Sequence, residues 1–306
     1  MIFETIEVLS NKFSIFEKMN ISELLKTIAA FFRLVRLNNL LIIVVTQYMA
    51  RVFLVGPKEE RLSYIFDYQQ FLLVFATVCI AAAGYIINDY FDIKIDMVNK
   101  PREVIIGKVI KRRRAILSHQ ILNFVGIAIG FYLGLKVFII NVFAVSALWF
   151  YSERFKRQAF IGNFVVAFLT AFSLIVLAVY YKKNEMLVNI YALFAFSISL
   201  IREIIKDMED IRGDARYGCR TLPIIWGIRR TKILLYVFIV IFVSILFFMA
   251  YSLHNQDLIM IFSGSIIVFT WLINKLYWAD RKKDFTLLSR ICKIIMIGGI
   301  ASMIFV

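Results

Sequence analysis

The chain has 306 residues, of which 61% are apolar and 16% aromatic, and its formal net charge is +15 at pH 7. A soluble domain contains about 45–50% apolar residues, so with a mean hydropathy of +0.79 the expected solvent is a lipid bilayer. Segments of about ten residues with alternating polarity, which a transmembrane β-barrel requires, are lacking. The charges lie between apolar runs rather than over one soluble face, which disfavours a nucleic-acid-binding protein.

Residues 1–37 carry acidic side chains among their apolar positions, at Glu4, Glu7, Glu17 and Glu23. A cleaved signal peptide begins with basic residues followed by an uninterrupted apolar core, and neither is present. We therefore expect this segment to form an amphipathic helix near the membrane surface, on the cytoplasmic side.

Nine apolar stretches further along the chain are each about as long as a transmembrane helix, which needs roughly 17–25 residues. They lie at 39–56, 68–88, 115–134, 136–151, 160–181, 186–206, 232–252, 257–276 and 286–306. Only a tight turn at Gly134 separates the third stretch from the fourth, and no domain linker interrupts the series. The sequence therefore predicts an all-α integral membrane protein, a single domain over residues 1–306 built as a bundle of nine helices.

The distribution of Lys and Arg predicts the orientation of this bundle. With the N-terminus in the cytoplasm, thirty of the thirty-six Lys and Arg residues fall on cytoplasmic segments, namely 1–38, 89–114, 152–159, 202–232 and 274–293. Short cytoplasmic loops carry such an excess of basic residues. Two of these segments, 89–114 and 202–232, also contain clusters of aspartates, so both clusters are expected to face the cytoplasm.

The first acidic cluster continues the second span with no helix breaker before Pro101. Asn88, Asp92 and Asp96 follow one another at intervals of four residues. Each interval turns a helix by only about 40° beyond a full turn, so the three side chains share one face. Like charges at this spacing repel each other and weaken a helix, and a divalent cation is the natural compensation.

The second acidic cluster places Asp207, Asp210 and Asp214 within about 60° of one another on a helix. The chain has only two histidines, and its three cysteines lie far apart without CxxC spacing, so neither a zinc site nor a disulfide is expected. Carboxylate and amide oxygens prefer Mg²⁺, which commonly fills its remaining positions with water and phosphate oxygens. Two such stripes on one membrane side predict a diphosphate held between two Mg²⁺ ions.

A cation-coupled membrane transporter is the alternative of another class, with the same aspartates forming an ion pathway. Transporters place such charges near the bilayer midplane, within broken helices. Here the charges follow the ends of two spans on one side of the membrane, which favours an enzyme.

At these residues the sequence resembles the UbiA-type intramembrane prenyltransferases. That family carries NDxxDxxxD after its second helix and DxxDxxxD after its sixth, in a bundle of nine helices. The matching residues are Asn88, Asp89, Asp92 and Asp96 in the first motif and Asp207, Asp210 and Asp214 in the second. The resemblance covers most of the chain, in the number of spans as well as in the place of both motifs.

Smaller segments are similar too. Arg36 and Asn39 open the first span, as a similar Arg and Asn do in the family, and the segment 151–157 resembles a cytoplasmic tyrosine–lysine segment that places a lysine, here Lys156, near the diphosphate. One departure stands out after Pro101. Glu103 takes the usual position of an arginine, so either Arg102 substitutes from one place earlier or that contact is absent.

The resemblance implies an allylic prenyl diphosphate as the donor, a lipophilic acceptor and two Mg²⁺ ions. One ion would be held by Asn88, Asp92 and Asp96, and the other by Asp207, Asp210 and Asp214. Lys156 would join four of these aspartates, Asp92, Asp96, Asp210 and Asp214, in catalysis. Further substrate contacts are expected from Arg36, Asn39, Asn88, Arg102, Tyr151, Lys156 and Lys206, and the candidate rings for stabilising an allylic cation are Tyr85, Tyr90, Phe91 and Tyr151.

One short stretch of the sequence indicates the identity of the acceptor. Residues 202–214, with Thr221-Leu222-Pro223, most resemble the geranylgeranylglycerol-phosphate geranylgeranyltransferases, which implies a geranylgeranylglycerol-phosphate-like lipid as acceptor. An aromatic acceptor of quinone biosynthesis, a hydroxybenzoate or a naphthoate, is the alternative. We expect a multi-pass protein in contact with membrane lipid and not with nucleic acid, whose active-site loops are cytoplasmic; the prenyl chain length and the oligomeric state stay open.

Overall fold

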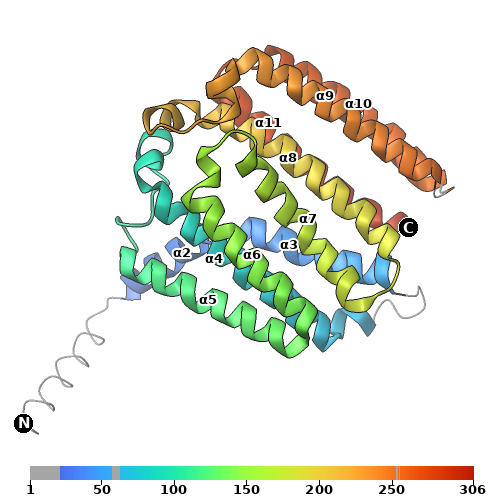
Figure 1. The fold of residues 1–306 in the computed structure, drawn as a ribbon, viewed down its shortest axis with the longest axis horizontal. Helices are drawn as coiled ribbons and strands as arrows, with labels where there is room; N and C mark the ends of the chain where they lie inside the picture. The colour runs from blue at the N-terminus through green and yellow to red at the C-terminus, as the bar shows by residue number, and fades with distance from the viewer. Residues whose placement is uncertain (1–20, 57–62, 253, 255) are drawn as a thin grey trace, which may run out of the picture.

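The computed structural model describes residues 21–56, 63–252, 254 and 256–306, and this part of the chain is built from helices (Figure 1). Its α-helices are α2 (Ile21–Leu34), α3 (Leu37–Met49), α4 (Tyr68–Asn99), α5 (Arg112–Leu133), α6 (Leu135–Glu153), α7 (Ile161–Tyr181), α8 (Glu185–Arg216), α9 (Leu222–Ser252), α10 (Gln256–Trp278) and α11 (Lys282–Ser302). Shorter turns are the π-helical η1 (Ala50–Val55) and the 3₁₀ segments η3 (Ser63–Phe66), η4 (Phe155–Arg157) and η5 (Met303–Phe305). The only β-pairing within the described residues consists of two isolated bridges.

The predicted number of spans is confirmed for the described residues, where nine helical segments are long and apolar enough to cross a membrane. Two of them continue about ten residues beyond their predicted C-terminal ends. Helices α4 and α8 each have 32 residues, about 48 Å of helix, whereas a bilayer core is about 30 Å thick. Their excess length carries the two acidic clusters, because these segments keep the helical conformation after their apolar pattern has ended.

Local sequence explains where several helices begin and bend. The side chain of Asp67 caps α4 by accepting hydrogen bonds from the backbone N–H groups of Gln69 and Gln70, at 2.9 and 3.3 Å. Gly134, with φ 135°, separates α5 from α6, as predicted. Gly227, with φ 78°, kinks α9 after its first turn; both conformations are ones that glycine adopts readily. The kink explains why α9 begins ten residues before the predicted start of the seventh span, residue 232.

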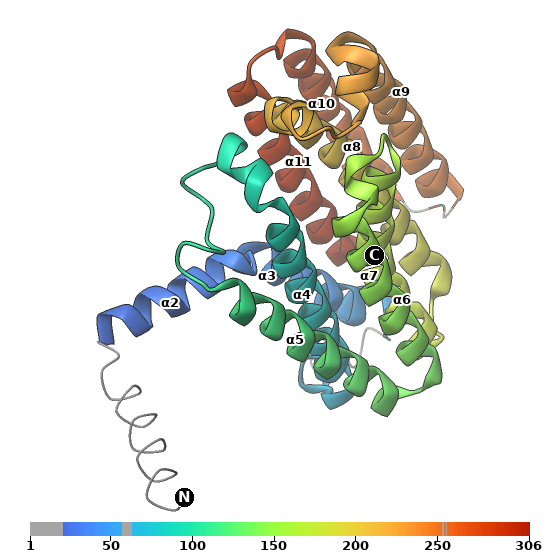
Figure 2. The same ribbon diagram turned by 60° about the vertical axis from the view of Figure 1, so that its left-hand side comes forward.

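Helices α4 and α8 form the interior of the bundle. Most of the apolar window of each is buried, at 61% and 72% of its residues, whereas the other seven spans bury at most 39%. Helix α4 packs against α3, α5 and α6, and α8 packs against α7, α9 and α11, an arrangement that can be followed in Figures 1 and 2. The two helices with the acidic clusters are therefore surrounded by spans whose outer faces are available to lipid.

Helix α2 projects sideways from the bundle (Figure 2). Its residues Leu24, Ile28 and Phe32, spaced four apart, are exposed, while Ala30 and Leu34 are buried against the protein. An apolar stripe that no protein covers is typical of a helix lying in the membrane interface. This helix lies within the predicted amphipathic segment 1–37, of which residues 1–20 are outside the described part of the chain.

Candidate active site

A cavity of about 940 Å³ lies between α2, α3, α4, α6, α7, α8 and α11. Its wall is charged near the ends of α4 and α8, at the start of α3 and on α11, and mainly apolar elsewhere. Ten of the predicted site residues line it: Arg36, Asn39, Asn88, Asp92, Asp96, Arg102, Tyr151, Lys156, Lys206 and Asp210. These residues come from segments far apart in the sequence, so the fold brings most of the predicted site into one place.

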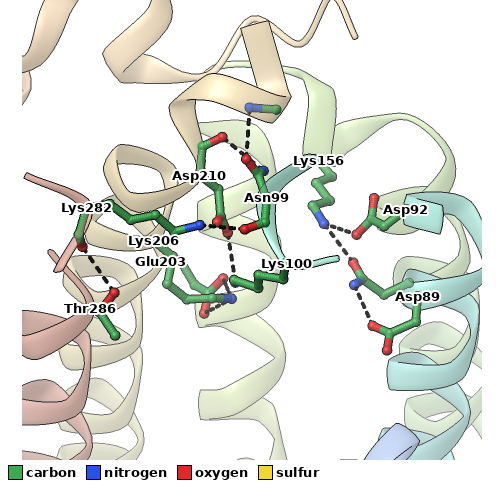
Figure 3. A network of polar contacts seen from close by, with 12 residues as sticks. Asp89, Asp92, Asn99, Lys100, Lys156, Glu203, Lys206, Asp210, Lys282 and Thr286 are labelled. Atoms are coloured by element: carbon green, nitrogen blue, oxygen red, sulfur yellow. Dashed lines mark hydrogen bonds and ion pairs between the residues drawn. The ribbon is translucent and has the colours of Figure 1, made fainter. Parts of the chain in front are cut away.

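On the α4 side, Lys156 of η4 lies over the first acidic cluster (Figure 3). Its Nζ donates hydrogen bonds to the Asp92 carboxylate and, at 3.3 Å, to Asn88 Oδ1. Burial lowers the pKa of the Lys156 ammonium, but Asp92 and Tyr151 raise it by more, so that the pKa stands well above its usual value. Lys156 therefore remains a positive charge fixed beside two of the predicted metal ligands.

Arg36 enters the same site from the start of α3. Its Nη2 lies 2.8 Å from Asp89 Oδ1, and its guanidinium lies 4.9 Å from the centre of the Tyr85 ring. Burial lowers the pKa of Arg36, yet Asp89 and Tyr85 raise it by more, so the pKa lies above its usual value. Asp89, which belongs to the family motif, thus positions a cation at the edge of the cavity.

On the α8 side, Asp210 is bonded to residues at the end of α4. Lys100 Nζ lies 3.1 Å from Asp210 Oδ2, and burial of Lys100, which lowers its pKa, is outweighed by Asp210, which raises it. The Asn99 side chain donates to the Asp210 backbone oxygen at 3.1 Å and accepts from the Gly213 N–H at 2.9 Å. A Cβ at Gly213 would lie 2.5 Å from Asn99 Cγ, so glycine is needed for α4 and α8 to approach this closely.

The remaining two aspartates of the second motif do not line this cavity. Asp207 Oδ2 accepts a hydrogen bond from Asn163 Nδ2 of α7 at 2.8 Å. Asp214 is buried, and its backbone oxygen accepts from the Cys219 N–H at 3.0 Å. Burial and the nearby Asp214 raise the pKa of the Cys219 thiol, which keeps it protonated and unsuited to binding a metal.

The donor atoms around the cavity fit Mg²⁺. They are carboxylate and amide oxygens, and Asp210 Oδ1 is buried with no hydrogen-bond partner among the described residues. In that part of the chain no three Asp, Glu, His or Cys side chains lie close enough to bind one ion by themselves. Mg²⁺ commonly takes only one or two protein carboxylates and completes its shell with water and substrate phosphates, so a substrate that brings phosphate oxygens would complete the ligand set.

Both residues at the point where the sequence departs from the family pattern, Arg102 and Glu103, line the cavity. Of the candidate aromatic rings, Tyr85 and Tyr151 line it as well. Tyr90 and Phe91 do not; they pack against each other, with ring centres 5.7 Å apart.

Sequence reasoning missed several residues of this cavity, namely Lys100, Arg202, Glu203 and Lys293. Lys100 adjoins the first acidic cluster, and its position at the end of that helix could have identified it as a site residue. Lys293 lies inside the last span, far from either motif, and an ionisable residue inside a transmembrane helix is itself a signal of function. The packing of α11 against α8 and α3 brings Lys293 into the site.

Comparison with known proteins agrees with this geometry. Residues 62–291 match the UbiA prenyltransferase family. The digeranylgeranylglyceryl phosphate synthase of Sulfurisphaera tokodaii is 34% identical over 220 residues, which cover 70% of this chain and 77% of that protein. A solved structure of digeranylgeranylglyceryl phosphate synthase in membranes superposes with a TM-score of 0.69 at 26% identity, covering 91% of this chain and 98% of that one.

A UbiA homologue from Archaeoglobus fulgidus, solved with DMAPP and Mg²⁺ bound, has the same fold with a TM-score of 0.63 at 16% identity. The match covers 89% of this chain and 98% of that one. The nine apolar helices, the two aspartate motifs around one cavity and the extent of the family match lead to one conclusion. The chain belongs to the UbiA prenyltransferase family and is a multi-pass membrane enzyme that transfers prenyl groups.

Proposed function

We propose that the enzyme transfers a geranylgeranyl group from geranylgeranyl diphosphate to the free hydroxyl of a geranylgeranylglycerol-phosphate-like lipid. The main support is a single cavity in which a charged end, with aspartates from α4 and α8, continues into apolar walls. Such a cavity suits a substrate with a diphosphate head and a long hydrocarbon tail. The lipid acceptor is supported by the 34% identity to a digeranylgeranylglyceryl phosphate synthase.

The donor would bind with its diphosphate between α4 and α8. Asn88, Asp92 and Asp96 would hold one Mg²⁺, and Asp210, which lines the cavity, would face the other, with Asp207 and Asp214 of the same motif set behind it. When bound, Mg²⁺ supplies Lewis-acid catalysis by neutralising the charge that develops on the leaving diphosphate. Asp207 lies behind the cavity wall on its bond to Asn163, so we expect it to support the second ion from the back rather than to face the substrate.

The protein's own cations and rings would complete the donor site. Lys156 and Arg36 would place positive charge beside the diphosphate oxygens. The bond between the diphosphate oxygen and the first prenyl carbon breaks, the acceptor oxygen forms the new bond to that carbon, and the hydroxyl proton is released. The apolar walls exclude water from the allylic cation, and the faces of Tyr85 and Tyr151 are placed to stabilise it.

We propose further that the charged end of the cavity faces the cytoplasm and that residues 1–306 form one domain. The distribution of Lys and Arg along the sequence supports this orientation. Mixed packing of early and late helices, such as α3 against α11, supports a single domain.

An acceptor panel tests the proposed function. Purified protein is incubated with Mg²⁺, geranylgeranyl diphosphate and one acceptor at a time: geranylgeranylglycerol phosphate, a hydroxybenzoate or a naphthoate. The products are identified by mass spectrometry. We expect the lipid phosphate to gain one geranylgeranyl group. Prenylation of an aromatic acceptor, with none of the lipid, would contradict the proposal.

A further inference from the structure

Four cations meet in the cavity among the predicted substrate contacts. Arg36 lies at the start of α3, Arg202 and Lys206 lie on α8, and Lys293 lies on α11; all four line the cavity. We call these four residues the basic cluster. They lie close enough together to interact electrostatically, and the carboxylate of Glu203 lies among them.

Glu203 compensates two of the four charges. Arg202 Nη1 lies 2.8 Å from Glu203 Oε1, and Lys206 Nζ lies 3.3 and 3.1 Å from the two oxygens of the same carboxylate. The Arg202 Nε is buried and has no hydrogen-bond partner among the described residues. One carboxylate therefore serves two cations and leaves a buried donor of Arg202 unused.

The other two cations are compensated less evenly. Arg36 is paired with Asp89, whereas the only hydrogen bond of Lys293 Nζ within the described residues goes to the neutral Asn39 Oδ1, at 3.0 Å. Placing an ammonium in a half-buried site without an opposite charge is unfavourable. The basic cluster thus has an excess of positive charge that a bound anion would offset.

Arg202 and Lys293 lie deeper in the bundle than the contact between the ends of α4 and α8, where Asn99 and Lys100 bond to Asp210. Arg202 precedes Asp210 by eight residues, about 12 Å along the helix. Lys282 Nζ, at the start of α11, donates to the Asn99 backbone oxygen at 2.7 Å. Lys293 follows it by eleven residues, about 16 Å further along α11. Arg202 and Lys293 therefore lie deeper in the cavity than Asp210, and the first acidic cluster of α4 reaches the same depth, because Asp89 pairs with Arg36.

The basic cluster begins beside the helix that we place in the membrane interface. Arg36 follows the end of α2 by two residues, and Phe32 and Arg33 of α2 line the cavity together with it. An amphipathic helix lies at the depth of lipid headgroups. An anionic headgroup that enters from the membrane beside α2 would therefore meet Arg36, the first cation of the basic cluster.

We propose that the basic cluster binds the phosphate monoester of the acceptor lipid, and that Arg202 and Lys293 select an acceptor carrying that phosphate. This proposal rests on the proposed function and adds the part of the site that recognises the acceptor. The guanidinium of Arg202 can bind two phosphate oxygens, and Lys206 and Lys293 add point charges. The donor diphosphate would lie with the aspartates and Lys156, so Arg202 and Lys293 would serve the acceptor alone, whereas Arg36, paired with Asp89, lies between the two substrates.

The test uses Lys293→Gln, whose amide keeps a donor for Asn39, and Arg202→Gln. Lys283→Gln is the matched control, because Lys283 lies on the same helix but is exposed and outside the cavity. The Michaelis constants for the phosphate lipid and for geranylgeranyl diphosphate are measured separately. Loss of one bond to a charged group should raise the constant for the phosphate lipid about 10- to 100-fold, leave that for the donor unchanged, and be reversed by Lys293→Arg.

A second measurement needs no turnover. Binding of geranylgeranylglycerol phosphate and of geranylgeranylglycerol without phosphate is measured in nanodiscs with EDTA and without donor. We expect Lys293→Gln to weaken binding of the phosphate lipid alone. Equal weakening for both lipids, or a raised Michaelis constant for the donor in place of the acceptor, would overturn the proposal.

The proposed function and the role of the basic cluster are contradicted by different results. If the wild-type enzyme prenylates no phosphate lipid, the proposed function is wrong. If it prenylates that lipid and Lys293→Gln has an unchanged Michaelis constant and unchanged binding, only the role of the basic cluster is wrong.

Discussion

Replacing Asp92 or Asp210 by asparagine is expected to lower the rate of prenyl transfer by about 10²–10³-fold, the size of effect seen when one group that stabilises transition-state charge is removed. Asparagine keeps the size of the side chain but removes its negative charge. For Asp92 the change also leaves the Lys156 ammonium without its carboxylate partner. The turnover number with saturating geranylgeranyl diphosphate and Mg²⁺ measures the effect.

The matched control is Asp257→Asn, because Asp257 is exposed in the first turn of α10 and does not line the cavity. The control should keep the wild-type rate, and all three variants should elute as folded protein in detergent. Wild-type turnover by either Asp92→Asn or Asp210→Asn would refute the assignment of these carboxylates to the donor site.

Removing divalent metal is expected to have the larger effect, reducing prenyl transfer to background. Without Mg²⁺ the aspartates of α4 and α8 would repel the donor diphosphate, since Lys156, Lys100 and Arg36 are already paired with carboxylates. Activity should disappear in EDTA and return when Mg²⁺ is added in excess. Ca²⁺ should restore less, because it prefers larger and less regular coordination shells than Mg²⁺.

Prenyl transfer that continues at the full rate in EDTA would show that the acidic clusters serve another purpose. Binding of the donor provides the control, because affinity for geranylgeranyl diphosphate should fall together with activity. A loss of activity with unchanged donor affinity would place the metal in a later step.

The fold was largely predictable because length and hydropathy define a transmembrane helix with little help from its neighbours. The ends of α4 and α8 were less predictable than the number of spans. The apolar pattern ends where the acidic clusters begin, yet the backbone stays helical as far as Asn99 and Arg216. There the hydrogen bonds of Asn99 with Asp210 and Gly213 stabilise both helix ends. Such contacts between distant segments leave no periodic pattern in the sequence.

The site was predictable where one helix determines which side chains share a face, as for Asn88, Asp92 and Asp96, which all line the cavity. On α8 the same reasoning grouped Asp207 with Asp210, but Asp207 lies against Asn163 of α7 instead. A helical face about 60° wide can meet two different neighbours, and only tertiary packing decides which of them each residue meets.

The basic cluster could not be predicted for a related reason. Arg202 and Lys293 are ninety-one positions apart in a chain with thirty-six Lys and Arg residues. Neither residue belongs to a motif, and nothing in the sequence connects one with the other.

The central claim is that α4 and α8 together hold the donor diphosphate through metal ions. It is tested most directly by a structure of this enzyme with Mn²⁺ and a non-reactive thiolo analogue of geranylgeranyl diphosphate, with the metal located by anomalous scattering. The account predicts metal peaks bounded by Asp92 and Asp96 on α4 and by Asp210 on α8, with the diphosphate between them. A diphosphate bound at Arg202 and Lys293, with no metal between the two helices, would contradict it.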